Sequence, residues 1–298
     1  MPLLLGTLYL CWGSSFLAIE LVVRDAPALL SAGIRFTLAG AVLFLAVVPR
    51  RGIRALIPRR GDLFMTVVLA LLLITLGNGG VVAAQRQGIP SWLAALLVAT
   101  IPVWIAIFRF IWGPRPHRIT LWGTAIGLCG TAALVSTAGL RLTGFGPIAL
   151  GLAGALGWAV AAFVSARRGG AQDPFVTAVQ QLLIGGTGLL IASVILESGE
   201  WNTTRWTVSS IAGLAWLTVA SSIIALVVFY RITALTSVSV ASTYAFTNPI
   251  VALVLSIVIL GVFPDVISVL AAPFVIAGVA LVIWGDRRKD SVRDYTIS

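Results

Sequence analysis

The sequence predicts an all-α polytopic membrane protein with ten transmembrane helices, arranged as two inverted five-helix repeats around a central cavity. Three observations lead to this prediction. The 298-residue chain is 59% hydrophobic and only 10% charged, whereas a soluble domain carries about 25% charged residues. Its apolar runs are long enough to cross a hydrocarbon core of about 30 Å. The second half of the chain also repeats features of the first half.

The apolar runs are about 20 residues long, which is the length that a helix needs to cross a bilayer. They do not alternate apolar with polar residues as membrane strands do. Short connections rich in Gly, Pro and polar residues separate them. The predicted spans, numbered 1 to 10, are residues 2–23, 27–48, 63–84, 91–112, 119–138, 146–166, 175–196, 209–230, 238–261 and 265–285.

A separate sequence feature marks each of the first five spans. Span 1 begins "MPLLLGTLYLCWGSSF", which lacks the basic start of a cleaved signal peptide and therefore predicts a retained helix. Span 2 begins at Pro27 and ends before the basic loop "RRGIRALIPRR". Span 3 contains "TLGNGG" and span 4 contains "ATIPVWIAIF". Span 5 contains "GTAIGLCG", whose GxxxG pattern favours close contact with another helix.

The second half follows the same order. Span 6 contains "WAVAAF" where span 1 has "WGSSF", and Pro174 lies at the start of span 7 as Pro27 lies at the start of span 2. Span 8 has Ser221 where span 3 has "TLGNGG", and span 9 repeats the Thr-x-Pro of span 4 in "FTNPIVALVL". Span 10 is rich in Gly and Ala, like span 5. Because five spans is an odd number, the second copy is inverted in the membrane, as in secondary transporters that bind substrate near the midplane.

Basic residues predict the orientation, because Lys and Arg accumulate in cytoplasmic loops. The net charge of +10 therefore sets topology and meets anionic lipid, and no nucleic-acid partner is expected. With both termini in the cytoplasm, residues 1–140 form the first repeat, 145–286 the second and 287–298 a basic cytoplasmic tail. The inner segments then hold 14 of the 20 Lys and Arg residues, namely Arg50, Arg51, Arg54, Arg59, Arg60, Arg115, Arg118, Arg167, Arg168, Arg231, Arg287, Arg288, Lys289 and Arg293.

Pro102 and Pro249 are 147 positions apart, and each lies about halfway along a predicted span. A proline inside a helix removes a backbone hydrogen bond and bends the chain. In lipid, the freed carbonyl needs a partner or a water-filled cavity. We interpret the pair as hinges beside Thr100 and Asn248; the alternative is a tolerated kink in a packed helix.

The two five-span halves, "LYLCWGSSFLAIE" in span 1, "AGIRF" in span 2 and the two proline spans resemble the drug/metabolite transporter superfamily, and most closely its EamA-type members. These include amino-acid and metabolite exporters, and the Trp-rich character is similar to the bacterial aromatic amino-acid exporter branch. The resemblance implies a multi-pass protein of the bacterial cytoplasmic (inner) membrane. It also implies a cavity lined mainly by spans 1, 3, 4, 6, 8 and 9, with spans 2, 5, 7 and 10 at the periphery.

A few polar and aromatic residues are the candidates for substrate binding. They lie deep in spans expected to line the cavity, where polar groups are costly unless they have a function or a partner. For each, helix packing is the alternative interpretation. Trp12 and Trp158 hold matching places in spans 1 and 6. The full predicted set is Trp12, Asn78, Thr100, Trp158, Ser221, Tyr244 and Asn248.

Glu20 and Arg35 are ionisable groups inside apolar runs, which usually mark function or pairing. Counted along their helices at about 1.5 Å per residue, they reach a similar depth. We expect either a structural ion pair between spans 1 and 2, or an outer gate or substrate ammonium contact through Glu20.

The resulting functional prediction is a secondary active or facilitative transporter. It would export small metabolites by alternating access, most plausibly aromatic or other apolar amino acids. A multidrug or nucleobase exporter of the same fold and a channel or scaffold are the alternatives. We see no Walker motif, catalytic cluster or metal-ligand set, so no enzyme activity, cofactor or metal is expected. The expected partners are a small-molecule substrate and the lipid bilayer, and the expected state is a monomer or weak homo-oligomer.

Overall fold

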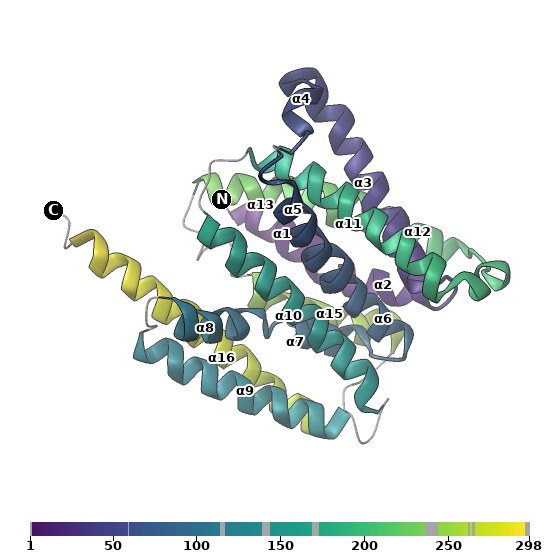
Figure 1. Cartoon of the computed structure of the whole chain (residues 1–298). Helices are drawn as coiled ribbons and strands as arrows, with labels where there is room; N and C mark the ends of the chain where they lie inside the picture. Colours follow the sequence, from purple (N-terminus) through teal and green to yellow (C-terminus); the bar gives the residue numbers. More distant parts are fainter. Residues whose placement is uncertain are drawn as a thin grey trace.

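The computed structural model describes residues 2–58, 60–113, 117–138, 144–168, 173–235, 244–261, 263 and 266–295, and these residues contain helices but no β-strand (Figure 1). Ten helical segments correspond to the ten predicted spans. In order they are α1 (Pro2–Gly13) with α2 (Ser15–Val23); α3 (Ala28–Arg51); α5 (Leu63–Ala70) with η1 (Leu71–Asn78) and α6 (Gly79–Arg86); α7 (Ser91–Val98) with α8 (Ile101–Trp112); α9 (Arg118–Ala138); α10 (Phe145–Arg168); α11 (Pro174–Leu196); α12 (Val208–Trp216) with η4 (Leu217–Ile224) and α13 (Ala225–Leu235); α15 (Tyr244–Leu255) with η5 (Ser256–Leu260); and α16 (Val266–Tyr295).

The all-helical prediction is confirmed, with differences at some helix ends. Among the described residues, seven helices are long and apolar enough to cross a membrane, and Thr247–Leu260 and Val269–Val282 are shorter apolar helices. The start predicted for span 9, residues 238–243, lies outside the described residues. The last helix continues to Tyr295, ten residues past the predicted end of span 10. Two short helices, α4 (Ile53–Leu56) and η3 (Ser198–Thr203), lie in connecting loops.

The outer surface of the helices is apolar. Large hydrophobic side chains are exposed along many spans, among them Leu45, Ile195, Val258 and Phe274. In water such continuous exposure would be costly, but in a bilayer lipid tails cover it at no such cost. The surface therefore fits a chain that is surrounded by lipid, with its polar side chains turned inward or toward the helix ends.

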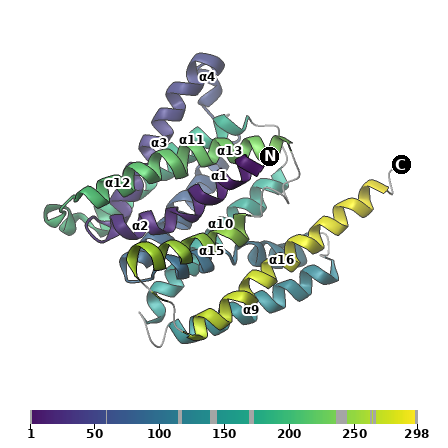
Figure 2. The same cartoon turned by 180° about the vertical axis from the view of Figure 1, so that it is seen from behind.

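Contacts between helices follow a two-fold pattern. When every span is exchanged for its counterpart five spans away, the largest contacts map onto one another or onto themselves. The pairs α3–α11 and α9–α16 map onto themselves, and so does α7–α15. In both views α9 and α16 lie side by side along one flank, and α3 and α11 lie on the opposite flank (Figures 1 and 2). This is the pattern expected of two five-helix repeats related by a two-fold axis.

Several other large contacts build the centre of the molecule and obey the same exchange. The packing of α10 against η1 and α6 corresponds to the packing of α1 and α2 against α13 and α12. Likewise, α1 packs on α15 as α10 packs on α8, and α3 packs on η4 as α11 packs on η1. The central helices therefore come from both halves, and the interface between the halves runs through the middle of the fold.

The flank formed by α9 and α16 depends on small residues, as the GxxxG pattern in span 5 predicted. A Cβ atom on Gly278 would collide with the backbone of Gly127, and one on Gly123 would collide with the carbonyl of Gly278. The two helices therefore approach until their backbones touch, which maximises van der Waals contact where no hydrophobic effect drives association.

Candidate functional site

A cavity of about 340 Å³ lies between the two halves. This volume falls in the range of small-molecule sites, about 300–1,000 Å³. Residues from spans 1 to 4 and 6 to 9 line it, and most of them are apolar. Six predicted binding residues lie on its wall, namely Trp12, Asn78, Trp158, Ser221, Tyr244 and Asn248.

Spans 2 and 7 are not wholly peripheral, contrary to what the resemblance implied. Arg35 and Phe36 of α3 reach the cavity, and so do Ala178, Gln181 and Leu182 of α11. The reason is that α3 packs on η4 and α11 packs on η1, so one face of each flanking helix fills the gap between central helices. The apolar pattern of these spans gave no indication of this inward face.

Aromatic side chains form much of the cavity wall. The ring of Trp12 packs edge-on against Tyr244, with centroids 4.6 Å apart, and lies 5.4 Å from Phe229. Trp158 lies in the matching place of the other half, next to Gly77, and packs against the buried cluster of Ile101, Ala155 and Ala159. Such rings offer wide apolar contact together with a few polar edges, which suits an amphipathic ligand.

Two π-helical segments border the cavity at equivalent places in the two halves. They are η1 and η4, which begin 146 positions apart, at Leu71 and Leu217. A π-helical turn is wider than an α-helical turn, is rare and often occurs at functional sites. Asn78 donates from Nδ2 to the Leu73 carbonyl within η1, at 3.2 Å. The indole Nε1 of Trp12 donates to the Ser221 carbonyl of η4, at 3.1 Å.

Arg35 does not pair with Glu20, contrary to the expected ion pair. Its Nε donates to Ser222 Oγ at 2.9 Å and its Nη2 donates to Ser221 Oγ at 3.0 Å. The guanidinium also lies 4.4 Å from the centroid of the Phe36 ring. Similar depth along two helices did not bring the partners together, because Arg35 lies on the face of α3 that packs on η4.

Glu20 instead makes its polar contacts at helix ends, outside the cavity. It accepts a hydrogen bond from Arg24 one turn later in α2, at 2.9 Å, and another from the backbone N–H of Ser91, at 2.9 Å. Ser91 is the first residue of α7, where free N–H groups and the helix dipole favour a carboxylate. Glu20 does not belong to the set of cavity-lining residues.

The two predicted hinges differ. Span 4 is interrupted between α7 and α8, and Pro102 is the second residue of α8. Thr100 lies in the interruption, is buried, and donates from Oγ1 to the Leu97 carbonyl at 2.6 Å. Thr100 therefore satisfies a backbone carbonyl, and it lies outside the cavity wall. The hydroxyl replaces a backbone partner where the helix is broken.

Pro249 lies inside the intact α15, close to its first described residue, Tyr244. The irregular part of span 9 is instead η5, which ends at Gly261 in a left-handed conformation. Neighbouring Asn248 is 6% exposed, and its Oδ1 has no hydrogen-bond partner among the residues that the structure describes. Neither Pro102 nor Pro249 lines the cavity, so the repeated Thr-x-Pro does not give two equal helix breaks.

The cavity extends toward the end of the molecule at which α1 begins, here called the N-terminal end. Consecutive spans alternate in direction, so α10 also ends there and α11 begins there. Of the lining residues at this end, Ser165 is exposed and Gln181 and Tyr244 are partly exposed. Toward the opposite end, Ile19 and Arg35 are both 5% exposed. The buried end forms the floor of the cavity.

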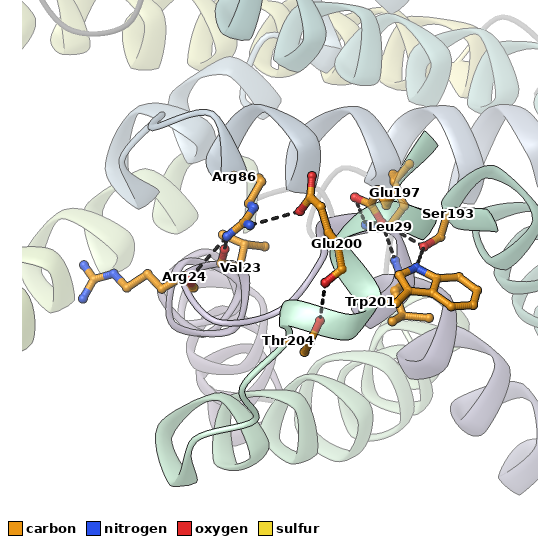
Figure 3. Close-up of polar contacts among 10 residues, drawn as sticks. Val23, Arg24, Leu29, Arg86, Ser193, Glu197, Glu200, Trp201 and Thr204 are labelled. Carbon is orange, nitrogen blue, oxygen red and sulfur yellow. Dashed lines mark hydrogen bonds and ion pairs between the residues drawn. The ribbon is translucent and has the colours of Figure 1, made fainter. Parts of the chain in front are cut away.

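Polar contacts close the opposite end beyond this floor. Arg86 at the end of α6 donates to the Val23 carbonyl at 2.6 Å and to the Arg24 carbonyl at 3.3 Å (Figure 3). It also forms a salt bridge with Glu200 of η3, at 3.1 Å. Since Glu200 belongs to the second half and Arg86 to the first, this group of contacts joins the halves. We call it the Arg86 latch.

A second polar group at this end ties α3 to α11. Glu197 accepts hydrogen bonds from the backbone N–H groups of Leu29 and Leu30 in the first turn of α3, at 2.9–3.0 Å. Ser193 Oγ donates to Glu197, and Trp201 Nε1 donates to Ser193 (Figure 3). The carboxylate thus caps a helix N-terminus from a neighbouring span.

Sequence reasoning missed Arg86, Glu197 and Glu200. All three lie at loop boundaries, where charged residues are common, and nothing in their spacing predicts that three separate connections meet. Gln181 lies in span 7, which the resemblance placed at the periphery. Only the packing of α11 on η1 shows that it lines the cavity.

Comparisons with known proteins agree with this architecture. The model of the EamA-like transporter family matches residues 2–136 and 146–284. The chain is 33% identical over 281 residues to the uncharacterized inner membrane transporter YedA of Escherichia coli (strain K12), covering 94% of this chain and 90% of that one. It is 28% identical over 264 residues to the uncharacterized transporter YvbV of Bacillus subtilis (strain 168), covering 87% and 83%.

A solved crystal structure with 21% sequence identity superimposes with a TM-score of 0.64, covering 96% of this chain and 97% of that chain. At this identity the similarity speaks for the fold alone. The family match includes most of both halves and therefore both walls of the cavity. The chain belongs to the EamA-like transporter family of membrane proteins.

Proposed function

We propose that this protein exports small amphipathic metabolites, foremost amino acids with aromatic or other apolar side chains, by alternating access. The observation that carries the proposal is the cavity of about 340 Å³ between the halves. Polar contacts cover its floor and its wall is partly exposed at the N-terminal end. A cavity that reaches one side of the molecule only is what a carrier needs in one of its two states.

The lining supports an amphipathic substrate. Trp12, Trp158, Phe229 and Tyr244 offer aromatic surface, while the polar groups on the wall are few. Hydrogen bonds fix orientation in such sites, and apolar contact supplies affinity. This composition favours an apolar amino acid over a sugar phosphate, which would need several basic groups.

The positive-inside bias places the N-terminal end in the cytoplasm. In that orientation the cavity takes substrate from the cytoplasm, and the Arg86 latch seals the outer side. We further propose that the protein resides in a bacterial inner membrane, as its relative YedA does by name. Rocking of one half against the other would break the latch and close the N-terminal end.

A counterflow experiment in proteoliposomes tests the proposal. Vesicles loaded with each natural amino acid, nucleobases and a cationic drug panel are assayed for uptake of trace labelled solute. We expect saturable exchange for aromatic or branched amino acids. Linear, unsaturable flux would indicate a channel, and the absence of flux for every solute would contradict transport.

A further inference from the structure

Arg35 is a buried positive charge on the cavity wall. It lies in α3 at the floor of the cavity, and only 5% of its surface is exposed. An arginine within a membrane helix is costly to insert into lipid, so such residues are rare and usually have a specific partner or function. A partner or a ligand must therefore compensate this charge.

The partners of Arg35 in the structure are all neutral. Ser221 and Ser222 accept hydrogen bonds from the guanidinium, and the ring face of Phe36 lies beneath it. Among the described residues that line the cavity, none is Asp or Glu. Hydroxyl dipoles and an aromatic face attract a cation, but they leave the full positive charge in the cavity.

The guanidinium of Arg35 also has N–H donors that no described residue uses. Arginine carries five N–H groups, and the two serines take one from Nε and one from Nη2. No described residue accepts a hydrogen bond from Nη1. The N–H groups of Nη1 and the second N–H of Nη2 therefore form an unused fork, and this planar geometry matches the two oxygens of a carboxylate.

Charge balance selects the ligand. One carboxylate, alone or as the anionic end of a zwitterion, gives the Arg35 guanidinium one matching negative charge, whereas a phosphate monoester with a charge of about −1.5 to −2 brings more negative charge than Arg35 balances. A drug without a carboxylate leaves the arginine without an anionic partner. The aromatic walls then receive the rest of the molecule.

We propose that Arg35 binds the carboxylate of the transported molecule, so that the substrate class is small amphipathic monocarboxylates. This inference rests on the proposed transport function and gives it a specificity-determining residue. The competing interpretation is that Arg35 only clamps α3 to η4 through the two serines.

The test uses the purified full-length protein and five phenyl compounds that differ in the polar group. They are L-phenylalanine, 3-phenylpropionate, L-phenylalaninamide, phenethylamine and phenyl phosphate. Binding is measured by isothermal calorimetry and by the rise in thermal unfolding temperature. We expect both carboxylates to bind at least about tenfold more tightly than the amide and the amine, because a bidentate hydrogen bond between arginine and a carboxylate is stronger than hydrogen bonds to neutral groups.

The unmutated protein alone can overturn the inference. Equal binding of the amide and the carboxylates would show that the site does not recognise the carboxylate charge. Tighter binding of phenyl phosphate than of 3-phenylpropionate would assign the site to phosphate compounds instead.

Variants separate recognition from clamping. Arg35→Met removes the charge and is expected to abolish the preference for carboxylates, and Arg35→Lys should restore part of it. Ser222→Ala removes one clamp but keeps the charge, so the preference should persist. Arg50→Gln removes an exposed arginine of the same helix outside the cavity and serves as the matched control, with an unchanged profile.

If Ser222→Ala and Arg35→Met lower the unfolding temperature equally and neither changes the order of ligands, Arg35 is only a clamp. Failure of the inference is distinct from failure of the proposed function. Saturable transport without carboxylate preference would leave the carrier proposal intact. If carboxylates bind in a way that depends on Arg35 but no solute is transported, the carrier proposal is contradicted, whereas the proposed carboxylate site at Arg35 is supported.

Discussion

Trp12 and Ser221 are 209 positions apart, yet the indole Nε1 of Trp12 donates to the Ser221 carbonyl at 3.1 Å. The bond connects the first helix of one half to the π-helical segment of the other, directly at the cavity wall. The same π-helical segment holds Arg35 through its serine hydroxyls. The interface between the halves and the candidate site are therefore the same set of contacts, so that rocking of the halves must change the site.

The Arg86 latch is expected to control which side of the molecule opens. Arg86→Gln removes the salt bridge to Glu200 and weakens the bonds to the α2 carbonyls. The equilibrium should shift toward an open latch end. A cysteine at Ile19, in a background without Cys11 and Cys129, should then react several-fold faster with a membrane-impermeant thiol reagent added on that side.

The matched control for the latch is Arg24→Gln. It removes an arginine of the same end whose ion pair lies within one helix, with Glu20, and should leave the labelling rate unchanged. Equal acceleration by both variants would show that loss of charge, and not loss of the latch, opens this end.

Glu20→Gln should leave gradient-driven exchange largely intact at every pH. Glutamine keeps an oxygen that can cap α7, and loss of the pair with the half-exposed Arg24 should cost less than about 1 kcal/mol. Transport is measured as counterflow between pH 6 and 8. Complete loss of exchange would instead assign Glu20 an essential role in gating or proton coupling.

Trp158→Ala should change substrate preference, with a larger loss for phenylalanine than for smaller apolar amino acids, because the indole forms part of the aromatic wall. Competition in the counterflow assay measures the order of substrates. Trp122→Ala is the control, since Trp122 is 70% exposed on α9. An unchanged order in the Trp158 variant would make this residue a packing element only.

Gly278→Ala should destabilise the flank formed by α9 and α16. The added methyl group has no space against the Gly127 backbone, and overpacking costs typically about 1–3 kcal/mol. A lower thermal unfolding temperature in detergent is expected. Gly6→Ala, at a helical position with no atom near the new Cβ, should preserve or raise that temperature; similar losses in both variants would contradict close packing as the cause.

The two prolines should contribute unequally. Pro102→Ala permits α7 and α8 to merge, because proline no longer blocks the turn at Thr100. Pro249 lies within a continuous helix, so Pro249→Ala should change transport less. Initial exchange rates, compared with folded yield, measure the difference. If Pro102→Ala transports at the normal rate, the interruption of span 4 does not act as a hinge.

The class of the protein follows from its amino-acid sequence, because lipid imposes strict demands on a chain. Apolar runs of about 20 residues must be helices, and their number, their short connections and the repeated Thr-x-Pro predicted two five-span halves. The same reasoning singled out Trp12, Trp158, Ser221 and Tyr244, which lie on the cavity wall, since aromatic or polar residues deep in spans of paired halves meet where the halves meet.

Which side chains contact one another follows only from the fold. Glu20 and Arg35 have similar depth, but rotation about the helix axis turns them toward different neighbours, and hydrophobic composition does not encode that rotation when lipid-facing and buried positions are equally apolar. The π-helical segments, the unequal prolines and the Arg86 latch likewise follow from how distant helices pack. The charge of Arg35 was visible in the sequence, whereas its place at the floor of a cavity without acidic side chains among the described residues became visible only in the fold.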